Sequence, residues 1–595
     1  MLQKLTFAAA HYAALAIFVA GCWGFGRVVV SRMGSPVRHD VWLETAMATA
    51  LGVGVFICAF QLLGIAGAFG TAGVLLLVAI GFAAACVQFP AWRREVRAFD
   101  PGLPLSWVDK AGLVALALVA LPTLLAPLAP PAAFDELMYH LPYAREVAQS
   151  GSLGIHEWLR YPWFPYNYNL LYAAALLVGD DVLAHFLNAL AGWLSVWMVY
   201  RLGVLHLNRV LGCAGAAIWL GMGDYSNALI DTGVALFVLA ACTALWWWRE
   251  SPPEQGPRWL ALAAFFLGLA AGSKYQALTF LPLVAWFVIR RERRPGVWAV
   301  ALVCFLVPCI YWYARNALMT GDPFNPIGAK LFGFSNWNLA DYKNQLDDVR
   351  IHAAFPSLLI WPVVLAPLSK AWRRSPAVHA AIIFCAYSVL VWALTSRYPR
   401  YLTASFPLIA LIAVLGWQVL LGWIVAGLRW LLPVASRVGW PVRAGSLFVV
   451  VFLAALAAVS VRHTARALTK VSPTPETREA FLRANVPGYA VMNYLREHAT
   501  GRVYQIGLSE AIYYGPDPIW GDALGPWRYT DFLPLPPAEM AHKLAKLGFE
   551  AIVMPDPLVP QITTGPGFDD HFALMYQKDG AKAYRILQYK NDRAP

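Results

Sequence analysis

Charged residues are scarce in this chain, and their scarcity narrows the class of protein. Of 595 residues, only 13% are charged and 59% are hydrophobic, and the mean hydropathy is +0.54. A soluble globular chain carries roughly 25% charged residues, so about half of the usual charge is missing. The shortfall lies between Met1 and about Val461, where apolar runs alternate with short polar breaks. We therefore expect a membrane-embedded region followed by a soluble C-terminal domain.

The usual sequence patterns for metal, disulfide and nucleotide sites are also missing. All eight cysteines lie inside apolar runs and none belongs to a CxxC pair, so neither a zinc site nor a disulfide framework is indicated. The chain has no Gly-rich loop of the kind that cradles nucleotide phosphates. We expect no metal and no cofactor, although acidic pairs such as Asp180-Asp181 would allow a divalent metal. No small-residue cleavage site follows the first apolar run, which we therefore expect to be retained.

About fourteen transmembrane helices are predicted, because a bilayer core needs about 20 apolar residues per helix. The expected fold class is a polytopic α-helical membrane protein with a C-terminal soluble α/β domain. The predicted spans are residues 8–30, 43–66, 70–88, 111–129, 182–203, 207–222, 229–248, 258–272, 276–289, 296–314, 354–370, 376–394, 401–428 and 444–461. They form a transmembrane domain over residues 1–461, with long polar loops at residues 130–181 and 315–355.

The distribution of Lys and Arg predicts which side of the membrane each loop faces. These residues collect before the fourth, tenth, twelfth and last predicted spans, for example Arg93, Arg94 and Arg97 before the fourth. Short basic loops favour the cytoplasm, so both long polar loops and the C-terminal domain are expected on the outer side. The net charge of +12 then reflects membrane topology rather than nucleic-acid binding.

Residues 462–595 have the composition of a soluble domain in which helices and strands alternate. The predicted elements are helices at residues 488–498 and 538–547 and strands at residues 503–506, 551–554 and 583–587. Amphipathic helices that each lead into a short apolar strand are typical of an α/β domain.

Two adjacent carboxylates, Asp135 and Glu136, open the first long loop directly beyond the fourth predicted span. A helix-like run that contains Tyr139 and His140 follows them. One interpretation makes Asp135 an N-cap and Glu136 a favourable first-turn charge. The other makes them a functional pair, because charged groups near membrane depth are costly and commonly functional. A cap does not exclude a site, so both interpretations stay open.

Four cationic side chains lie on the same predicted outer face. Lys274 occupies the turn between two short apolar runs, and Arg315 ends the tenth span. Arg397 and Arg400 lie at the outer end of a span, against the positive-inside trend. A lysine in such a turn either extends toward lipid headgroups or holds a phosphate as a point charge. Cations near a carboxylate pair suit an anionic substrate and a proton acceptor.

The order of these elements resembles the GT-C superfamily of polyprenyl-phosphate-dependent glycosyltransferases. The likeness is to the branch of the protein O-mannosyltransferases and the lipid A aminoarabinose transferases. The matching residues are Asp135-Glu136 with Tyr139 and His140, Asp231 before Leu236, Lys274-Tyr275, Arg315-Asn316 with a turn of Gly321, Pro323 and Pro326, and Arg400-Tyr401 before Pro407. They cover most of the chain from about residue 110 to 430, and the three spans before residue 110 are additional to the family pattern.

The resemblance implies a GT-C-like fold and an inverting transfer from a sugar carried on a polyprenyl phosphate. The residue in the position of Asp135 acts as general base on a hydroxyl acceptor, and Glu136 orients it or raises its pKa by like charge. The implied donor-phosphate ligands are Lys274, Arg397, Arg400 and Arg315, and the implied substrate contacts are Tyr139, His140, Tyr401 and Tyr275. The implied location is the bacterial cytoplasmic (inner) membrane, with an outer-leaflet active site and an extracytoplasmic C-terminal domain.

The expected enzyme moves a hexosyl or pentosyl group to a hydroxyl of a glycolipid, polysaccharide or protein, with membrane lipids and no nucleic acid as partners. Two other functions fit parts of the sequence. A transporter or flippase for a lipid or amphipathic anion would show inverted repeats and interrupted midplane helices, and we find no convincing repeat. An oligosaccharide ligase or polymerase would share the chemistry and move a larger chain.

Overall fold

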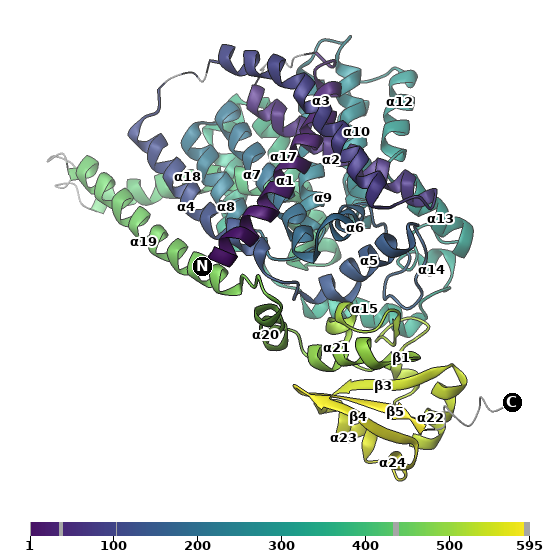
Figure 1. Ribbon diagram of the computed structural model, residues 1–595. Coiled ribbons are helices and arrows are strands. Elements are labelled where there is room, and N and C mark those ends of the chain that lie inside the picture. The colour runs from purple at the N-terminus through teal and green to yellow at the C-terminus, as the bar shows by residue number, and fades with distance from the viewer. Residues whose placement is uncertain (1, 35–39, 101, 103, 432–439, 588–595) are drawn as a thin grey trace.

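The computed structural model describes residues 2–34, 40–100, 102, 104–431 and 440–587. Its larger part is a bundle of apolar helices, and its smaller part is an α/β domain that projects from one end of the bundle (Figure 1). The smaller domain adjoins α15 (Leu339–Ile351) and α20 (Pro475–Asn485) in this view. The chain is thus a multi-pass helical membrane protein with a small C-terminal sheet domain, which confirms the predicted fold class.

Nine helices of the described ranges are long and apolar enough to cross a membrane. They are α1 (Leu2–Val30), α2 (Val41–Ile65), α3 (Thr71–Ala98), α4 (Trp107–Leu125) with η1 (Ala126–Leu128), α7 (Asp181–His206), α9 (Asp231–Glu250), α17 (Pro376–Thr395), η5 (Pro399–Ser405) with α18 (Phe406–Leu431), and α19 (Trp440–Lys470). A tenth crossing results if α12 (Pro295–Leu306) and α13 (Ile310–Thr320), bent by 72°, form one broken span.

Shorter apolar helices complete the bundle. They are α6 (Asn169–Val178), α8 (Arg209–Met222), α10 (Gly256–Ala271), η3 (Tyr275–Phe280) with α11 (Leu281–Ile289), and η4 (Leu358–Leu368). Every predicted span coincides with a helix, but four of them coincide with these shorter helices. Fourteen full crossings therefore stay a prediction. The helix α6 lies inside the first long loop, where no span was predicted.

The three additional N-terminal helices pack tightly because small residues let their backbones approach. A Cβ atom at Gly26 would lie 1.7 Å from the carbonyl oxygen of Ala48, and one at Gly52 would lie 1.7 Å from that of Cys22. Arg27 of α1 also pairs with Glu44 of α2 and with Glu95 of α3. The three helices thus form a unit held by close contact and by ion pairs.

The C-terminal sheet has the strand order β2-β1-β3-β5-β4. Its strands are β1 (Arg502–Gln505), β2 (Ile519–Trp520), β3 (Phe549–Pro555), β4 (Phe572–Lys578) and β5 (Ala581–Ile586). The first three pair in parallel, and β5 runs antiparallel to both β3 and β4. The predicted strands correspond to β1, β3 and β5. The two others were not predicted, because β2 has two residues and β4 is an edge strand with largely exposed side chains.

The remaining helices lie in loops or around the sheet. They are η2 (Glu136–His140), α5 (Leu141–Ser150), α14 (Ala329–Phe332), α16 (Lys370–Arg374), α21 (Tyr489–His498), η7 (Ser509–Tyr514), η8 (Tyr529–Asp531), α22 (Pro537–Lys546), η9 (Asp556–Leu558), α23 (Val559–Thr563) and α24 (Phe568–His571). Both long predicted loops thus contain short helices. The helix α19 continues past the predicted boundary at residue 461 to Lys470, and α20 begins at Pro475.

Candidate functional site

Four charged side chains from four separate elements meet at one end of the bundle. Asp135 directly precedes the π-helical turn η2, and Asp231 is the first residue of α9. Lys274 lies between α10 and η3, and Arg400 lies in η5, which packs against α9. Each residue stands at a helix end, where the sequence changes from apolar to polar. We call these four residues the charge cluster.

The charge cluster is a continuous chain of ion pairs. The Nζ atom of Lys274 lies 2.5 Å from Oδ1 of Asp231, and Nε of Arg400 lies 2.9 Å from Oδ2 of the same carboxylate. A second guanidinium nitrogen of Arg400 donates to Oδ2 of Asp135. The four side chains are 12–23% exposed, so they are largely shielded and still reachable by solvent or a ligand. The formal charges of the cluster sum to zero.

The carboxylate of Asp135 does not cap a helix. It makes no hydrogen bond to the backbone of η2, and its backbone already has helical dihedral angles. Burial by itself would raise the pKa of Asp135, but Arg400, with a smaller effect from Lys274, holds that pKa below its usual range. Asp135 is therefore ionised at neutral pH, and it can accept a proton.

Glu136 has a different environment from Asp135, although the two are adjacent. It is completely buried, and its Oε2 accepts from the backbone N–H groups of Ala132 and Ala133. Its Oε1 accepts from the N–H of Ala228 at 2.7 Å and pairs with His185. The pKa of Asp135 is lowered chiefly by Arg400, so a like-charge effect of Glu136, one of the two roles considered for it, does not dominate that pKa. Glu136 instead fixes the backbone on both sides of the cluster.

Aromatic and imidazole groups surround the charge cluster. The ammonium of Lys274 lies 5.2 Å from the ring centroid of Tyr401, and the ring of Tyr139 packs against His140 at 4.0 Å between centroids. Burial lowers the pKa of His140 to about 3, so its imidazole is neutral at physiological pH. Its Nδ1 lies 3.0 Å from the amide nitrogen of Asn169, and its buried Nε2 has no hydrogen-bond partner within the described ranges.

Two of the predicted phosphate ligands lie outside the charge cluster. Arg315 is buried against Trp163 and Trp312, and its guanidinium donates to Oδ1 of Asn316. Arg397 is exposed, and its Nε donates to the carbonyl oxygen of Ala393. Neither arginine forms an ion pair with a described carboxylate. The structure thus brings Asp135, Lys274 and Arg400 together and leaves these two apart.

Tyr275, a predicted substrate contact, belongs to the surroundings of Arg315. Its hydroxyl accepts from the Asn316 amide at 3.0 Å and lies 3.1 Å from the carbonyl oxygens of Trp163 and Asn325. These bonds tie the turn after Lys274 to the first long loop. Tyr275 therefore holds the loop that carries Lys274, and its hydroxyl is fully engaged.

Asp231 is the member of the charge cluster that the sequence did not assign to the predicted site. The resemblance to the GT-C pattern included Asp231 before Leu236, yet no role was given to it. In the structure its two oxygens hold Lys274 and Arg400 in a fixed relation. The sequence did contain a sign of this role. Asp231 is an acidic residue at the start of an otherwise apolar helix, and a charge in such a place requires a partner.

The C-terminal domain docks beside the charge cluster. The turn η7 packs on η2, and the hydroxyl of Tyr514 donates to the carbonyl of Pro131. Arg160 of the first long loop pairs with Asp522 of the domain at 2.5 Å. Burial opposes the charge of Arg160, but Asp522 and, more weakly, Asp135 hold its pKa above the usual value. Arg160 thus links the domain to the surroundings of Asp135.

Three more ion pairs join the domain to the bundle. Arg145 pairs with Asp517, Arg478 with Asp181, and Arg528 with Asp341, all at 2.5–2.8 Å.

Within the described part of the chain, no group of three or more His, Cys, Asp or Glu side chains is arranged to hold a metal ion.

Two family profiles match parts of the chain. Residues 165–312 match the profile described as dolichyl-phosphate-mannose-protein mannosyltransferase, and residues 477–585 match one described as SF2091/S2213. The first match confirms the resemblance to the GT-C glycosyltransferases that the motifs indicated. It supports transferase activity for this multi-pass membrane protein.

Two proteins of Shigella flexneri are similar in sequence over short stretches. Uncharacterized protein SF2093/S2215 is 43% identical over 72 residues, which are 12% of this chain and 36% of that protein. Uncharacterized protein SF2092/S2214 is 25% identical over 134 residues, which are 20% of this chain and 72% of that protein. The chain thus spans about a third of the length of the first relative.

Solved structures of two enzymes superpose on most of the chain. ArnT from Cupriavidus metallidurans, bound to undecaprenyl phosphate, shares 15% identity with a TM-score of 0.49, over 81% of this chain and 98% of ArnT. The archaeal oligosaccharyltransferase AglB from Archaeoglobus fulgidus, in complex with an inhibitory peptide and a dolichol-phosphate, shares 13% identity with a TM-score of 0.46, over 82% and 75% of the two chains.

Proposed function

We propose that this chain is an inverting membrane glycosyltransferase that moves a sugar from a polyprenyl-phosphate donor to a hydroxyl acceptor. The observation that carries the proposal is the contact of Arg400 with both Asp135 and Asp231. Asp135 is the proton acceptor, and Asp231 also holds the second cation, Lys274. Transfer from a lipid phosphate needs both kinds of group within one site. The match to a mannosyltransferase profile supports the same reaction class.

In the proposed reaction the acceptor oxygen attacks the anomeric carbon of the sugar from the face opposite the phosphate. A new C–O bond forms, the bond to the phosphate oxygen breaks, and its electron pair leaves with the lipid phosphate. Asp135 takes the proton from the acceptor hydroxyl. One displacement with one base inverts the anomeric centre, since no covalent enzyme intermediate forms.

The cations of the charge cluster stabilise the leaving group in this proposal. Negative charge develops on the phosphate oxygen, and preorganised Lys274 and Arg400 would neutralise it. In the present arrangement both cations are already paired with carboxylates. Donor binding therefore requires Arg400 to exchange Asp135 for the phosphate. That exchange also frees Asp135 for the acceptor, which couples donor binding to activation of the base.

The location of the site follows from the loops on the two sides of the bundle. The cluster stands at the ends of α9, η3 and η5 that are remote from the basic loops. Because basic loops favour the cytoplasm, we assign the cluster and the C-terminal domain to the outer side of the bacterial cytoplasmic membrane. The acceptor is then a glycolipid, polysaccharide or protein hydroxyl reached from that side.

Donor turnover in detergent tests the proposal. Lipid extract from a strain lacking the gene is added to the purified protein, and mass spectrometry follows conversion of glycosyl polyprenyl phosphate to free polyprenyl phosphate. A transferase consumes the donor without a membrane, whereas a flippase does not, because detergent removes the two compartments. Transfer of one sugar or of a chain separates the transferase from an oligosaccharide ligase or polymerase.

The matched variants for this assay are Asp135→Asn and Asp347→Asn. Asp347 is an exposed carboxylate that pairs with the exposed Arg350, so its variant should turn over donor normally. Donor that remains intact with wild-type protein and acceptor-containing extract would contradict the transferase assignment. Equal turnover by both variants would show that Asp135 takes no part in the reaction.

A further inference from the structure

A cavity lies at the opposite end of the bundle from the charge cluster. The helix α9 begins with Asp231 in the cluster, and its last turns carry Trp246 and Arg249, which line the cavity. At 1.5 Å per residue, the two ends of this helix are about 30 Å apart. The helix α17 runs the other way, from Ser375 at the cavity toward η5 and Arg400. About 30 Å is the thickness of a bilayer core, so the cavity and the cluster lie on opposite sides of the membrane.

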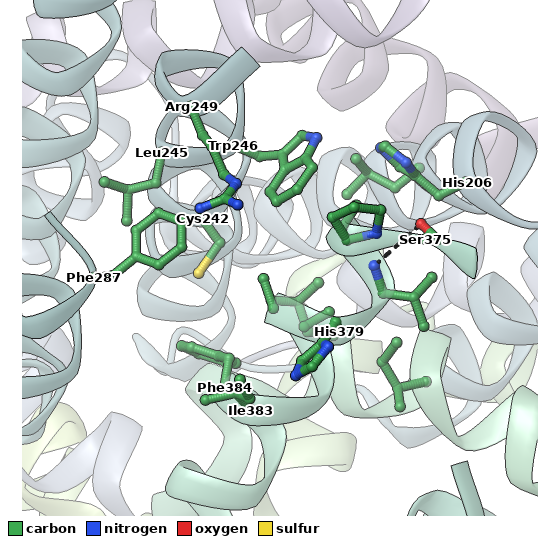
Figure 2. Close-up of a pocket in the computed structure, with 18 of the residues that line it drawn as sticks. His206, Cys242, Leu245, Trp246, Arg249, Phe287, Ser375, His379, Ile383 and Phe384 are labelled. Atoms are coloured by element: carbon green, nitrogen blue, oxygen red, sulfur yellow. Dashed lines mark hydrogen bonds between the residues drawn. The ribbon is translucent and has the colours of Figure 1, made fainter. Parts of the chain in front are cut away.

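The cavity has apolar walls and room for part of a lipid chain. Its volume is about 540 Å³, and it is bounded by α7, α9, α11, α17 and α18. Figure 2 shows Leu245, Phe287, Ile383 and Phe384 around the opening, with Cys242 on the wall formed by α9. A space of this size with aliphatic and aromatic walls suits hydrocarbon.

The rim of the cavity carries concentrated positive charge. Five arginines line it: Arg249, Arg290, Arg291, Arg373 and Arg374. Across the described ranges, none of the five forms an ion pair with a carboxylate. The nearby carboxylate of Glu292 is engaged by Arg294 at 2.7 Å. The rim thus differs from the charge cluster, where carboxylates of the chain itself neutralise Lys274 and Arg400.

Two further features favour an anion at the rim. The N-terminus of α17 opens at the cavity, where Ser375 accepts from the N–H of Val378 (Figure 2) and Ser375 lines the space. The positive end of a helix attracts anions. Arg249 lies 5.7 Å from the Trp246 ring centroid, and Arg290 lies 4.6 Å from that of Trp286. Aromatic rings beside arginines are typical of the membrane–water interface.

We propose that this cavity binds an anionic lipid of the cytoplasmic leaflet, with its phosphate at the arginine rim and a hydrocarbon chain between α9 and α17. The unpaired arginines match a phosphate, which guanidinium groups bind through paired hydrogen bonds. The apolar walls favour a lipid over a free phosphate ion, because a free ion would leave them unfilled. The site is independent of the proposed transfer reaction, which occurs at the other membrane face.

Lipid retention tests the proposal. The full chain is placed in nanodiscs of phosphatidylcholine with a minor fraction of phosphatidylglycerol, extracted with mild detergent, and analysed by native mass spectrometry. The triple variant Arg249→Gln/Arg373→Gln/Arg374→Gln should retain phosphatidylglycerol about tenfold less tightly or weaker still, since it loses several charged hydrogen bonds. Its control, Arg93→Gln/Arg94→Gln/Arg97→Gln, removes the same charge from exposed positions of α3 outside the cavity and should match wild type. Equal losses in both triples would mean that only general surface charge attracts the lipid.

A second pair of variants tests whether the cavity binds the hydrocarbon chain of the lipid, without changing the charge of the protein. Ala381→Trp fills the cavity from α17, whereas Ala386→Trp adds the same bulk to an exposed position of that helix outside the cavity. Retention should fall for the first and persist for the second. Retention that survives Ala381→Trp, or inorganic phosphate that displaces phosphatidylglycerol at a similar concentration, would overturn a lipid site. Thermal melting of each variant verifies that the fold is intact.

Discussion

Asp135 and Glu136 are neighbours in sequence, yet they are engaged by different parts of the molecule. Asp135 contacts the guanidinium of Arg400 in a partly exposed place, while Glu136 is held by backbone N–H groups and by His185. A partly exposed carboxylate with one ionic partner can change partners during a reaction. A fully buried carboxylate with four partners cannot do so without disrupting its surroundings.

Substitution of each carboxylate should therefore show whether it acts in the transfer reaction or in stabilising the fold. Asp135→Asn removes the proton acceptor, and transfer should fall roughly 10²–10⁴-fold with little change in Tm. Glu136→Gln weakens bonds to buried donors, at a cost of about 1.5–3 kcal/mol, and should lower Tm. Turnover and thermal melting of the two variants are the measurements. Normal transfer by Asp135→Asn would assign the base to another residue.

The pH dependence of transfer should report the pairing of Asp135 with Arg400. The pKa of Asp135 is held below its usual value, so the carboxylate loses its charge only when the pH falls through that lowered pKa. The acid limb of kcat/KM should lie below the ordinary Asp pKa of about 3.9. In Arg400→Gln the limb should move to higher pH, because the main stabilising cation is gone. An unmoved limb would show that another group controls it.

Lys274 should act chiefly on the donor. Lys274→Ala removes a charged hydrogen bond to phosphate, which is worth about 1.5–3 kcal/mol, or roughly a 10- to 100-fold weaker use of limiting donor. Lys330 provides a matched control, because it is an exposed lysine of α14 that contacts the ring of Tyr342. Near-normal turnover of Lys274→Ala at limiting donor would make this lysine a headgroup contact.

At the scale of elements, short helices and turns place the reactive groups. Asp135 directly precedes η2, Arg400 lies in η5, and Asp231 begins α9. Each of these elements brings one charged side chain to the cluster. The turn η7 of the C-terminal domain then packs on η2. The domain therefore contacts the turn that follows Asp135, and it pairs with Arg160 of the same loop.

The link between Arg160 and Asp522 is expected to couple the domain to transfer. In a double-mutant cycle with Arg160→Gln and Asp522→Asn, the double variant should lose less turnover than the two single losses combined, because either substitution alone already breaks the same largely buried pair. The exposed pair of Arg350 and Asp347 is the control, and its coupling should be within about 1 kcal/mol of zero. Additive effects at the Arg160–Asp522 pair would mean that the domain does not act through it.

At the scale of the whole molecule, topology decides whether the proposed mechanism is feasible. Asp135, Lys274, Arg400 and the domain after residue 462 should all face the extracytoplasmic side. Single cysteines introduced at these positions, in a background without the eight native cysteines, should react with an impermeant maleimide added to spheroplasts. Cysteines at Arg93 and Arg373 should react only after lysis. Labelling of Asp135→Cys only from the cytoplasm would contradict the outer-face site.

The amino-acid sequence by itself determined the elements of this protein. Hydropathy is a local property, so apolar runs located the helices of the bundle, and the alternation near residues 488–554 located α21, β1, α22 and β3. Local patterns also marked Asp135, Lys274 and Arg400, because each is a charge at the end of an apolar run. Edge strands such as β4, whose side chains are largely exposed, left too weak a pattern.

Only the tertiary structure decided which of those residues meet. Asp135 and Arg400 are 265 positions apart in the chain, and no local pattern specifies a contact over that distance. Packing of η5 on α9 brings Arg400 to Asp231, while the packing of α13 takes Arg315 to Trp163 and Asn316 instead. The physical reason is that a buried or half-buried charge must find an opposite charge or a hydrogen bond, and the fold determines which partner is within reach.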